Sequence, residues 1–232
     1  PILFVDQDLL VIDKPAGLLS LPDGYDQSLQ HVKTVFTQEF GELRIVHRLD
    51  RDTSGVMVLA RNAEAHKSLN SQFESRKVNK IYTALVIGRP EWEQKSLDLP
   101  LRINVGRRHR TAVDLDRGKE AITHVTVTER LFDYCLVEAK PETGRRHQIR
   151  AHLATEGYPI ACDGLYGNQF NILQSDVNID REGDTNPTEP VMNRIALHAR
   201  SIEFFHPSFR HLLNFEAPLP ADVLHLLKLL RP

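Results

Sequence analysis

Long apolar runs, a leader pattern and cysteine pairs are all missing from this sequence. No stretch of about eighteen consecutive apolar residues occurs, so we expect neither a membrane-spanning helix nor a membrane partner. A basic segment followed by an apolar one is also missing, so we expect no secretory leader; the chain opens at Pro1 rather than Met, and we expect residues before it. Cys135 and Cys162 are isolated and predict buried thiols in a reducing, cytoplasmic compartment.

An excess of positive charge is missing too. The chain has 29 Lys and Arg against 31 Asp and Glu, a net charge of −2, whereas nucleic-acid-binding proteins are usually basic. The arginines are nevertheless clustered, and local patches govern phosphate contacts more than net charge does. Each cluster is either a solvated basic surface or a substrate-binding patch; they are Arg102, Arg107, Arg108 and Arg110 with His109, and Arg145, Arg146 and Arg150 with His147 and His152.

Signatures of several enzyme classes are absent. There is no Gly-x-Ser-x-Gly elbow, no P-loop and no dinucleotide fingerprint, and Asp52–Gly55 differs from an aspartic-protease loop by an extra Ser and has no second copy. His147 and His152 are five residues apart, about 140° around a helix, so they do not share a face for a metal. We therefore expect no metal at these histidines.

Periodicity predicts alternating strands and helices. We expect strands at 2–5, 9–12, 56–60, 80–87, 122–128 and 131–139, and helices at 28–40, after Asn62, after Gly144 and after Pro220. No linker divides the chain, so we expect one catalytic domain over residues 1–232. It would carry an Arg-rich loop or hairpin insertion at 91–120 and a mobile surface loop at 171–190, where periodicity is lost.

The most informative stretch is residues 44–61. HRLDRDTSG (47–55) is polar, and VMVLA (56–60) after it is typical of a buried strand. Arg48 and Arg51 flank Asp50, which favours its ionised form. An ionised carboxylate in a partly dry site can act as a nucleophile or general base, whereas the same residues could also form a plain solvated loop.

This stretch resembles the signature of the RluA-type pseudouridine synthases, and two further motifs of that family follow in order. The second is Lys80-Ile81-Tyr82 at the start of a strand; by itself, Tyr82 reads as a half-buried sheet aromatic. The third is TGRRHQIR (143–150). The segment Lys14-Pro15-Ala16-Gly17 is also similar, so Lys14 is either a solvated turn lysine or a residue near the site.

The resemblance implies a set of roles. Asp50 would be the catalytic nucleophile, Arg150 its ionic partner, and Tyr82 would stack on uracil and relay a proton. Arg48 would fill the gap left by the flipped base, which suits a guanidinium because it can stack and hydrogen-bond together. His47 would brace the loop beside the substrate. Apart from the resemblance, the clustering of Arg107, Arg108 and Arg110 makes them candidates for contacts with RNA phosphates, and Arg145 of the second cluster is a further candidate.

The fold that the resemblance implies is α+β, with a mixed, largely antiparallel central sheet, flanking helices and a central catalytic cleft. The implied reaction is isomerisation of uridine to pseudouridine in transfer or ribosomal RNA, without a cofactor. Separately from the resemblance, we expect a monomer. Some members carry an N-terminal S4 RNA-binding domain, and we expect none within this sequence. Three alternatives stay open: a catalytically silent RNA-binding module of the same fold, a hydrolase that uses Asp50, and a sugar or nucleotide enzyme that does not act on RNA.

Overall fold

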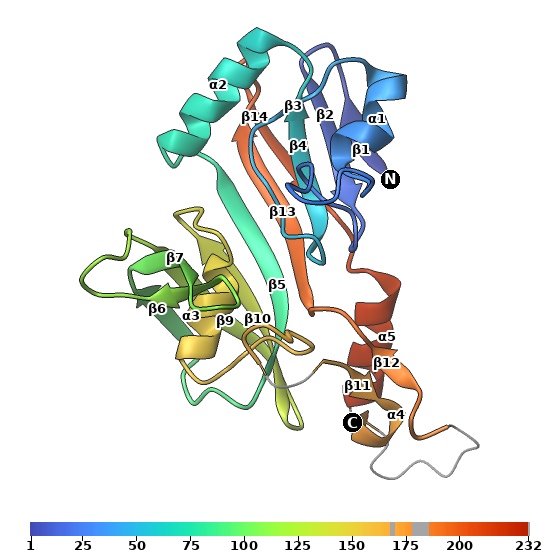
Figure 1. The fold of residues 1–232 in the computed structure, drawn as a ribbon, viewed down its shortest axis with the longest axis vertical. Coiled ribbons are helices and arrows are strands. Elements are labelled where there is room, and N and C mark those ends of the chain that lie inside the picture. The colour runs from blue at the N-terminus through green and yellow to red at the C-terminus, as the bar shows by residue number, and fades with distance from the viewer. Residues whose placement is uncertain (168–169, 178–185, 232) are drawn as a thin grey trace. The chain divides into compact units, whose positions relative to one another are not determined.

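A computed structural model describes residues 1–167, 170–177 and 186–231 (Figure 1). Contacts between Cα atoms group the chain into two compact units, Pro1–Tyr82 with His198–Pro218, and Thr83–Leu197 with Leu219–Pro232. In the described residues, no helix is long and apolar enough to cross a membrane. The predicted α+β class with a mixed, largely antiparallel sheet is confirmed, while the single domain and its central cleft stay predictions.

The first unit is a sheet whose central strand is buried on both faces. Its strands are β1 Ile2–Val5, β2 Leu9–Lys14, β3 Arg44–Ile45, β4 Ser54–Ala60, β13 Leu197–Phe205 and β14 Leu212–Glu216. β2 lies antiparallel to β1 and to β4, β13 runs parallel to β4, and β14 is antiparallel to β13. All seven residues of β4 are buried, as the apolar run predicted.

One helix covers each face of this sheet. Side chains alternate along β4, so successive residues of this strand pack against different helices. Val56, Val58 and Ala60 pack with Ala65 and Leu69 of α2 Ala63–Glu74, whereas Met57 and Leu59 pack with the cluster that holds Val32 of α1 Val32–Phe40. The predicted N-cap is confirmed, since the Asn62 side chain accepts the Ala65 N–H at 2.8 Å. The first helix starts at Val32, four residues later than predicted.

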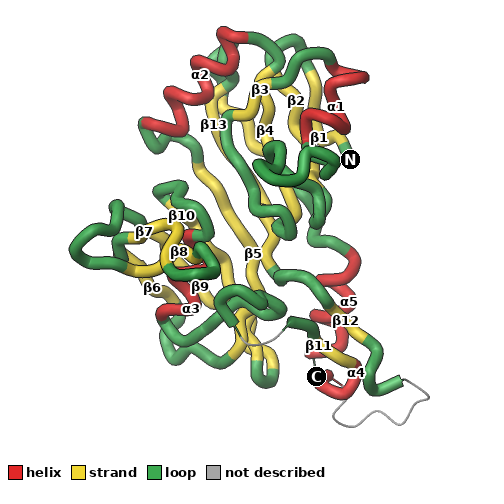
Figure 2. Tube along the Cα trace, viewed as in Figure 1, coloured by secondary structure: helices red, strands yellow, loops and turns green. Residues whose placement is uncertain are grey.

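The second unit contains an antiparallel sheet and a separate hairpin. β9 Ile122–Leu131 lies between β10 Tyr134–Pro141 and β6 Gln94–Asp98, and β5 Asn79–Ile87 has its last five residues in this unit. β7 Leu101–Val105 and β8 Arg110–Val113 form a hairpin within the 91–120 segment, one of the two arrangements that the sequence left open (Figure 2). The predicted third helix is α3 Gln148–Thr155, and it contacts β8, β9 and β10.

The remaining elements of this unit are short, except for the last helix. β11 Ile172–Leu173 pairs with β12 Pro190–Met192, and α4 Gln174–Val177 follows β11 directly. Residues 172–177, predicted as part of a mobile loop, thus form a strand and a helical turn, and residues 178–185 of that prediction lie outside the described residues. α5 Ala221–Leu230 is the predicted closing helix, and it contacts β12.

Candidate active site

The Asp50 loop is held at the start of the most buried strand of the first unit. It lies between β3 and β4, and the Thr53 N–H donates to the Asp50 carbonyl at 3.1 Å. Leu49 and Thr53 are buried, Asp50 is half-buried, and Arg48 is exposed. The loop therefore presents Asp50 near the surface on a rigid support, which is a common placement for catalytic groups.

Lys14 ties this loop to the turn after β2. Its ammonium donates to the carbonyls of Pro15, Leu18 and Arg51 at 3.0, 2.8 and 3.0 Å, and the side chain has no exposed surface. The interpretation of Lys14 as a solvated turn lysine is therefore wrong, and the alternative interpretation, that Lys14 lies beside the Asp50 loop, is correct. Burying an ammonium is costly unless it is hydrogen-bonded, so this side chain fixes the two segments together.

Ser20 and Gly17 add further links between the same segments. Ser20 Oγ donates to the Leu49 carbonyl at 2.7 Å and accepts the Leu49 N–H at 3.0 Å. The Gly17 N–H donates to the Arg51 carbonyl at 2.9 Å, and Arg51 Nε donates back to the Gly17 carbonyl at 3.3 Å. Asp50 is thus bracketed by anchored residues on both sides.

Gly55 permits the close approach of β4 and β13. Its φ of 112° is one that side-chain-bearing residues rarely adopt, and a Cβ there would overlap the carbonyl of Ala199. Next to it, Ser54 Oγ lies 3.0 Å from His198 Nδ1, and both side chains are buried. This Ser–His pair links two strands and faces no solvent, so it is a structural contact.

Two contacts hold the His47 side chain, at the start of the loop, against β4 and α2. Its Nε2 accepts the Val58 N–H at 2.9 Å, and its ring stacks on Phe73 of α2 with centroids 5.0 Å apart. Burial, with a smaller contribution from the nearby Lys80 charge, lowers the pKa of His47 to about 3. The ring is therefore neutral at physiological pH, as its role of acceptor from a backbone N–H requires.

The β5 residues Tyr82 and Lys80 lie near residues of this loop, Tyr82 near Leu49 and Asp50, and Lys80 near His47. Tyr82 packs on the cluster that contains Leu49 and Met57. Burial first, and the charge of Asp50 second, raise the pKa of Tyr82 well above its usual value. Burial lowers the pKa of Lys80 to about 8. The Tyr82 phenol thus keeps its proton at working pH and lies within the field of the Asp50 carboxylate.

Arg150 is held by a carboxylate of its own unit. Its Nε and one terminal nitrogen donate to Asp163 at 2.7 and 2.9 Å, and its guanidinium lies 5.1 Å from the ring centroid of Tyr166. The side chain of Asp163 is 1% exposed, and that of Arg150 is 12% exposed. Such a buried, bidentate pair fixes the orientation of the guanidinium. Its expected pairing with Asp50 joins the two units and stays a prediction.

The turn before α3 is shaped by a buried glutamine. Gln148 Oε1 accepts from Thr143 Oγ1 and the Arg145 N–H at 2.8 and 3.0 Å, and Nε2 donates to the Ile122 carbonyl and Thr123 Oγ1, both at 2.9 Å. This accounts for a glutamine in the third motif, because one side chain positions both ends of the turn.

The predicted RNA-contacting arginines lie on the β7–β8 hairpin and before α3. Arg107 is exposed, Arg108 donates to the Gly164 carbonyl at 2.6 Å, Arg110 donates to that of Leu165 at 3.4 Å, and Arg145 donates to that of Glu120 at 3.0 Å. Arg108 and Arg110 therefore link the hairpin to the turn that Asp163 begins. Their fixed guanidiniums still have donors for phosphate, since each carries five N–H groups.

Sequence reasoning missed Ser20, Asp163 and Tyr166. Asp163 and Tyr166 belong to YPIACDGLYG (158–167), a segment whose turn-forming composition gave no hint of an ion pair. In the described part of the chain, no group of three His, Cys, Asp or Glu side chains could hold a metal ion.

Comparisons with known proteins identify what this chain is similar to. A family model described as RNA pseudouridylate synthase matches residues 8–155, a range that contains all three motifs. The chain is 40% identical to the ribosomal large subunit pseudouridine synthase D of Pseudomonas aeruginosa and 36% identical to that of Neisseria meningitidis serogroup B, in each case over 241 residues. It spans 71% and 61% of these two proteins, and the matches cover 99% of it.

A solved structure shares the fold. Human RNA pseudouridylate synthase domain containing 4 superposes with a TM-score of 0.75 at 26% identity, over 99% of this chain and 92% of that one. The likeness thus extends from the motifs to the arrangement of strands and helices.

Proposed function

Since the chain belongs to the RNA pseudouridylate synthase family, we propose that it isomerises specific uridines of large-subunit ribosomal RNA, with Asp50 as the catalytic nucleophile. The family that the three motifs predicted is confirmed, and with it the enzyme class and RNA as the substrate. The two relatives named for the large ribosomal subunit favour ribosomal RNA over transfer RNA.

One observation supports the assignment of Asp50 most directly. The carboxylate is half-buried on a loop that Lys14 and Ser20 anchor on either side, and its charge reaches the partly buried phenol of Tyr82. A nucleophile needs a defined position and a nearby proton donor or acceptor, and this arrangement supplies both.

The chemistry needs only one carboxylate. In pseudouridine formation the bond from C1′ to N1 breaks, the uracil turns, a bond from C1′ to C5 forms, and the proton at C5 is replaced by one at N1. A glycosidase uses two carboxylates because a leaving group departs and water replaces it. Here the leaving group stays and attacks again, so Asp50 can act alone, at C1′, at C6 of the base, or on the C2′ proton.

The other residues have supporting roles in this proposal. Arg150, oriented by Asp163, would hold Asp50 ionised, and Tyr82 would stack on the uracil and relay a proton. Arg48 is exposed at the start of the loop, where it can take the place of the flipped base. Arg107, Arg108, Arg110 and Arg145 would contact the RNA backbone.

The test compares the wild type with Asp50→Asn and with Asp52→Asn, an exposed carboxylate of the same loop, as the matched control. Unmodified transcripts of large-subunit ribosomal RNA and transfer RNA are incubated with each protein, and pseudouridines are mapped at single-nucleotide resolution. We expect discrete ribosomal sites for the wild type and Asp52→Asn and none for Asp50→Asn.

Other results would point elsewhere. Release of free uracil would identify a hydrolase, and modification of transfer RNA alone would correct the substrate. RNA binding without any modification by the wild type would refute the enzyme and favour the silent module.

A further inference from the structure

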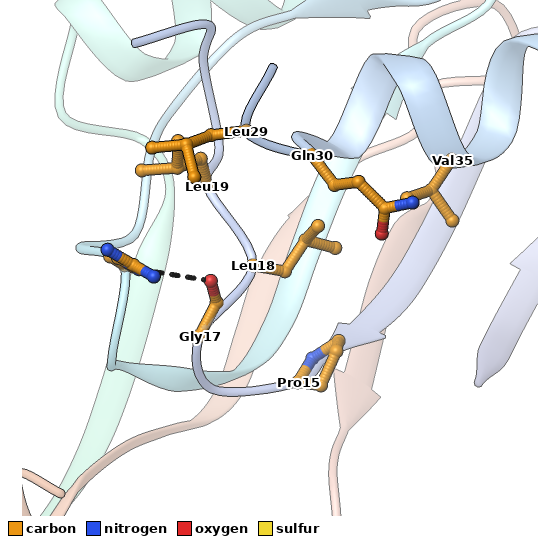
Figure 3. Close-up of a pocket in the computed structure, with 8 residues that line it drawn as sticks. Pro15, Gly17, Leu18, Leu19, Leu29, Gln30 and Val35 are labelled. Carbon is orange, nitrogen blue, oxygen red and sulfur yellow. Dashed lines mark hydrogen bonds between the residues drawn. The ribbon is translucent and has the colours of Figure 1, made fainter. Parts of the chain in front are cut away.

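The first unit has a pocket beside the Asp50 loop that the proposed chemistry does not use. It has a volume of about 390 Å³ and lies between the turn after β2, the start of α1 and Arg51 (Figure 3). Leu18, Leu19, Leu29 and Val35 give it apolar walls, and the Gln30 amide lies among them. This volume falls within the range of small-molecule sites, about 300–1,000 Å³.

The pocket and the Asp50 loop share anchoring contacts. The Gly17 N–H, at the pocket wall, donates to the carbonyl of Arg51, and Lys14 bonds the carbonyls of both Leu18 and Arg51. Arg51 follows Asp50 directly in the chain, and its guanidinium donates to the Gly17 carbonyl at the pocket edge. A ligand in the pocket would therefore lie next to the loop that carries the nucleophile.

An exposed aromatic side chain stands on the loop that joins two walls of this pocket. Residues 20–28 connect Leu19 to Leu29, and within them Tyr25 is fully exposed, at 102% of its reference surface. The Asp23 carboxylate accepts the N–H groups of Tyr25 and Asp26 at 2.8 and 3.0 Å, which orders the loop around the tyrosine. A solvent-exposed aromatic ring is a surface on which single-stranded bases can stack, and the Asp23 carboxylate that orders the loop lies within the field of the Arg51 charge.

We propose that this pocket receives an unstacked nucleobase of the substrate RNA, one next to the target uridine, with Arg51 on its phosphate and Tyr25 against its face. Apolar walls suit the face of a base, an amide can pair with its edge, and a guanidinium suits the phosphate. Flipping the target uridine disrupts the stacking of its neighbours, and a pocket for one neighbour recovers part of that loss. The proposal rests on the proposed function for the identity of the RNA.

The two pocket variants are neutral substitutions, so that changes in charge do not obscure their result, and Arg51→Gln tests the phosphate contact separately. Val35→Asn makes one wall polar, and Tyr25→Ala removes the ring; both side chains are exposed, so the fold is retained. Leu224→Asn is the matched control, an apolar residue on α5 of similar exposure, 51% against 43% for Val35. RNA dissociation constants and turnover are measured on the same transcripts, at several salt concentrations.

We expect Val35→Asn and Tyr25→Ala each to raise the dissociation constant by about 5- to 100-fold, as for the loss of one stacked base. Their salt dependence and kcat should match the wild type. Arg51→Gln should reduce the slope of the logarithm of the binding constant against the logarithm of the salt concentration by about one, as for the loss of one phosphate contact. Leu224→Asn should change neither binding nor turnover. In addition, 2-aminopurine placed beside the target uridine should show a fluorescence change on binding that Val35→Asn diminishes.

Several outcomes would overturn the proposal. Wild-type affinity in both pocket variants would mean that the pocket does not contact RNA, and a fall in kcat alone would mean that it only supports the loop. A change of oligomeric state in Val35→Asn would identify a contact between copies instead. Since binding is measured apart from turnover, a protein that binds RNA but forms no pseudouridine refutes the proposed function while the pocket variants still decide this proposal. A protein that binds no RNA refutes both.

Discussion

Substituting Lys14 by Met tests whether the Asp50 loop depends on a buried ammonium group. Met keeps an unbranched apolar side chain that is one atom shorter, but it cannot donate to the carbonyls of Pro15, Leu18 and Arg51. A hydrogen bond to a charged group contributes about 1.5–3 kcal/mol, and less where water can replace the donor. Pro15 and Arg51 are exposed residues and Leu18 is half-buried, so we take a value below that range, about 1 kcal/mol for each bond. The expected decrease in the free energy of unfolding is about 3 kcal/mol.

The assay is urea unfolding followed by circular dichroism, with kcat and KM measured where the variant is folded. We expect kcat to fall by tenfold or more, since a shift of about 1 Å in a catalytic group can cost on the order of a hundredfold. Lys67→Met is the control, because Lys67 is exposed on α2 of the same unit; its effect should stay within about 0.5 kcal/mol. A Lys14→Met protein with unchanged stability and unchanged kcat would refute the anchoring role.

Three further predictions concern single residues. Gly55→Ala should be destabilised by about 3 kcal/mol or more in thermal unfolding, because its Cβ meets Ala199, whereas Gly24→Ala, with open space around it, should be near neutral. His47 stays neutral when folded down to about pH 3, whereas the unfolded side chain gains a proton below about pH 6.5. The unfolded state therefore binds more protons in that window. As the pH is lowered through it, the free energy of unfolding in urea titrations should decrease by up to about 1.4 kcal/mol per pH unit. The His47→Gln variant should lack this part of the pH dependence. Tyr82→Phe keeps the aromatic ring but removes the phenolic hydroxyl, so kcat should fall by roughly a hundredfold or more with KM nearly unchanged. A kcat equal to that of the wild type would exclude a proton relay through Tyr82.

Local patterns in the sequence predicted most of the secondary structure. The run 56–60 became the buried strand β4, Asn62 became the cap of α2, and the apolar residues after Pro220 became α5. These predictions succeeded because periodicity and capping depend on residues close in the chain. The first helix was predicted four residues too long at its start, where Leu29 instead lines the pocket outside any helix.

The motifs also indicated which side chains carry the chemistry, but not what holds them. Arg150 was expected to serve a carboxylate, yet its bidentate partner Asp163 was hidden in a turn-rich segment. The loop-bracing role of His47 was predicted, whereas its neutral state follows from burial against Phe73 and from the Val58 N–H.

By itself, the sequence determined the family, the order of the three motifs and the strand that carries the Asp50 loop. Only the tertiary structure decided that Lys14 is buried rather than solvated, because β2 pairs with β4 in the register that sets Lys14 opposite Gly55. The same register places Arg51 and Gly17 within hydrogen-bonding distance and forms the pocket between them and α1. Register is a property of strands that are distant in the chain, and a shift by one residue would turn each side chain to the other face.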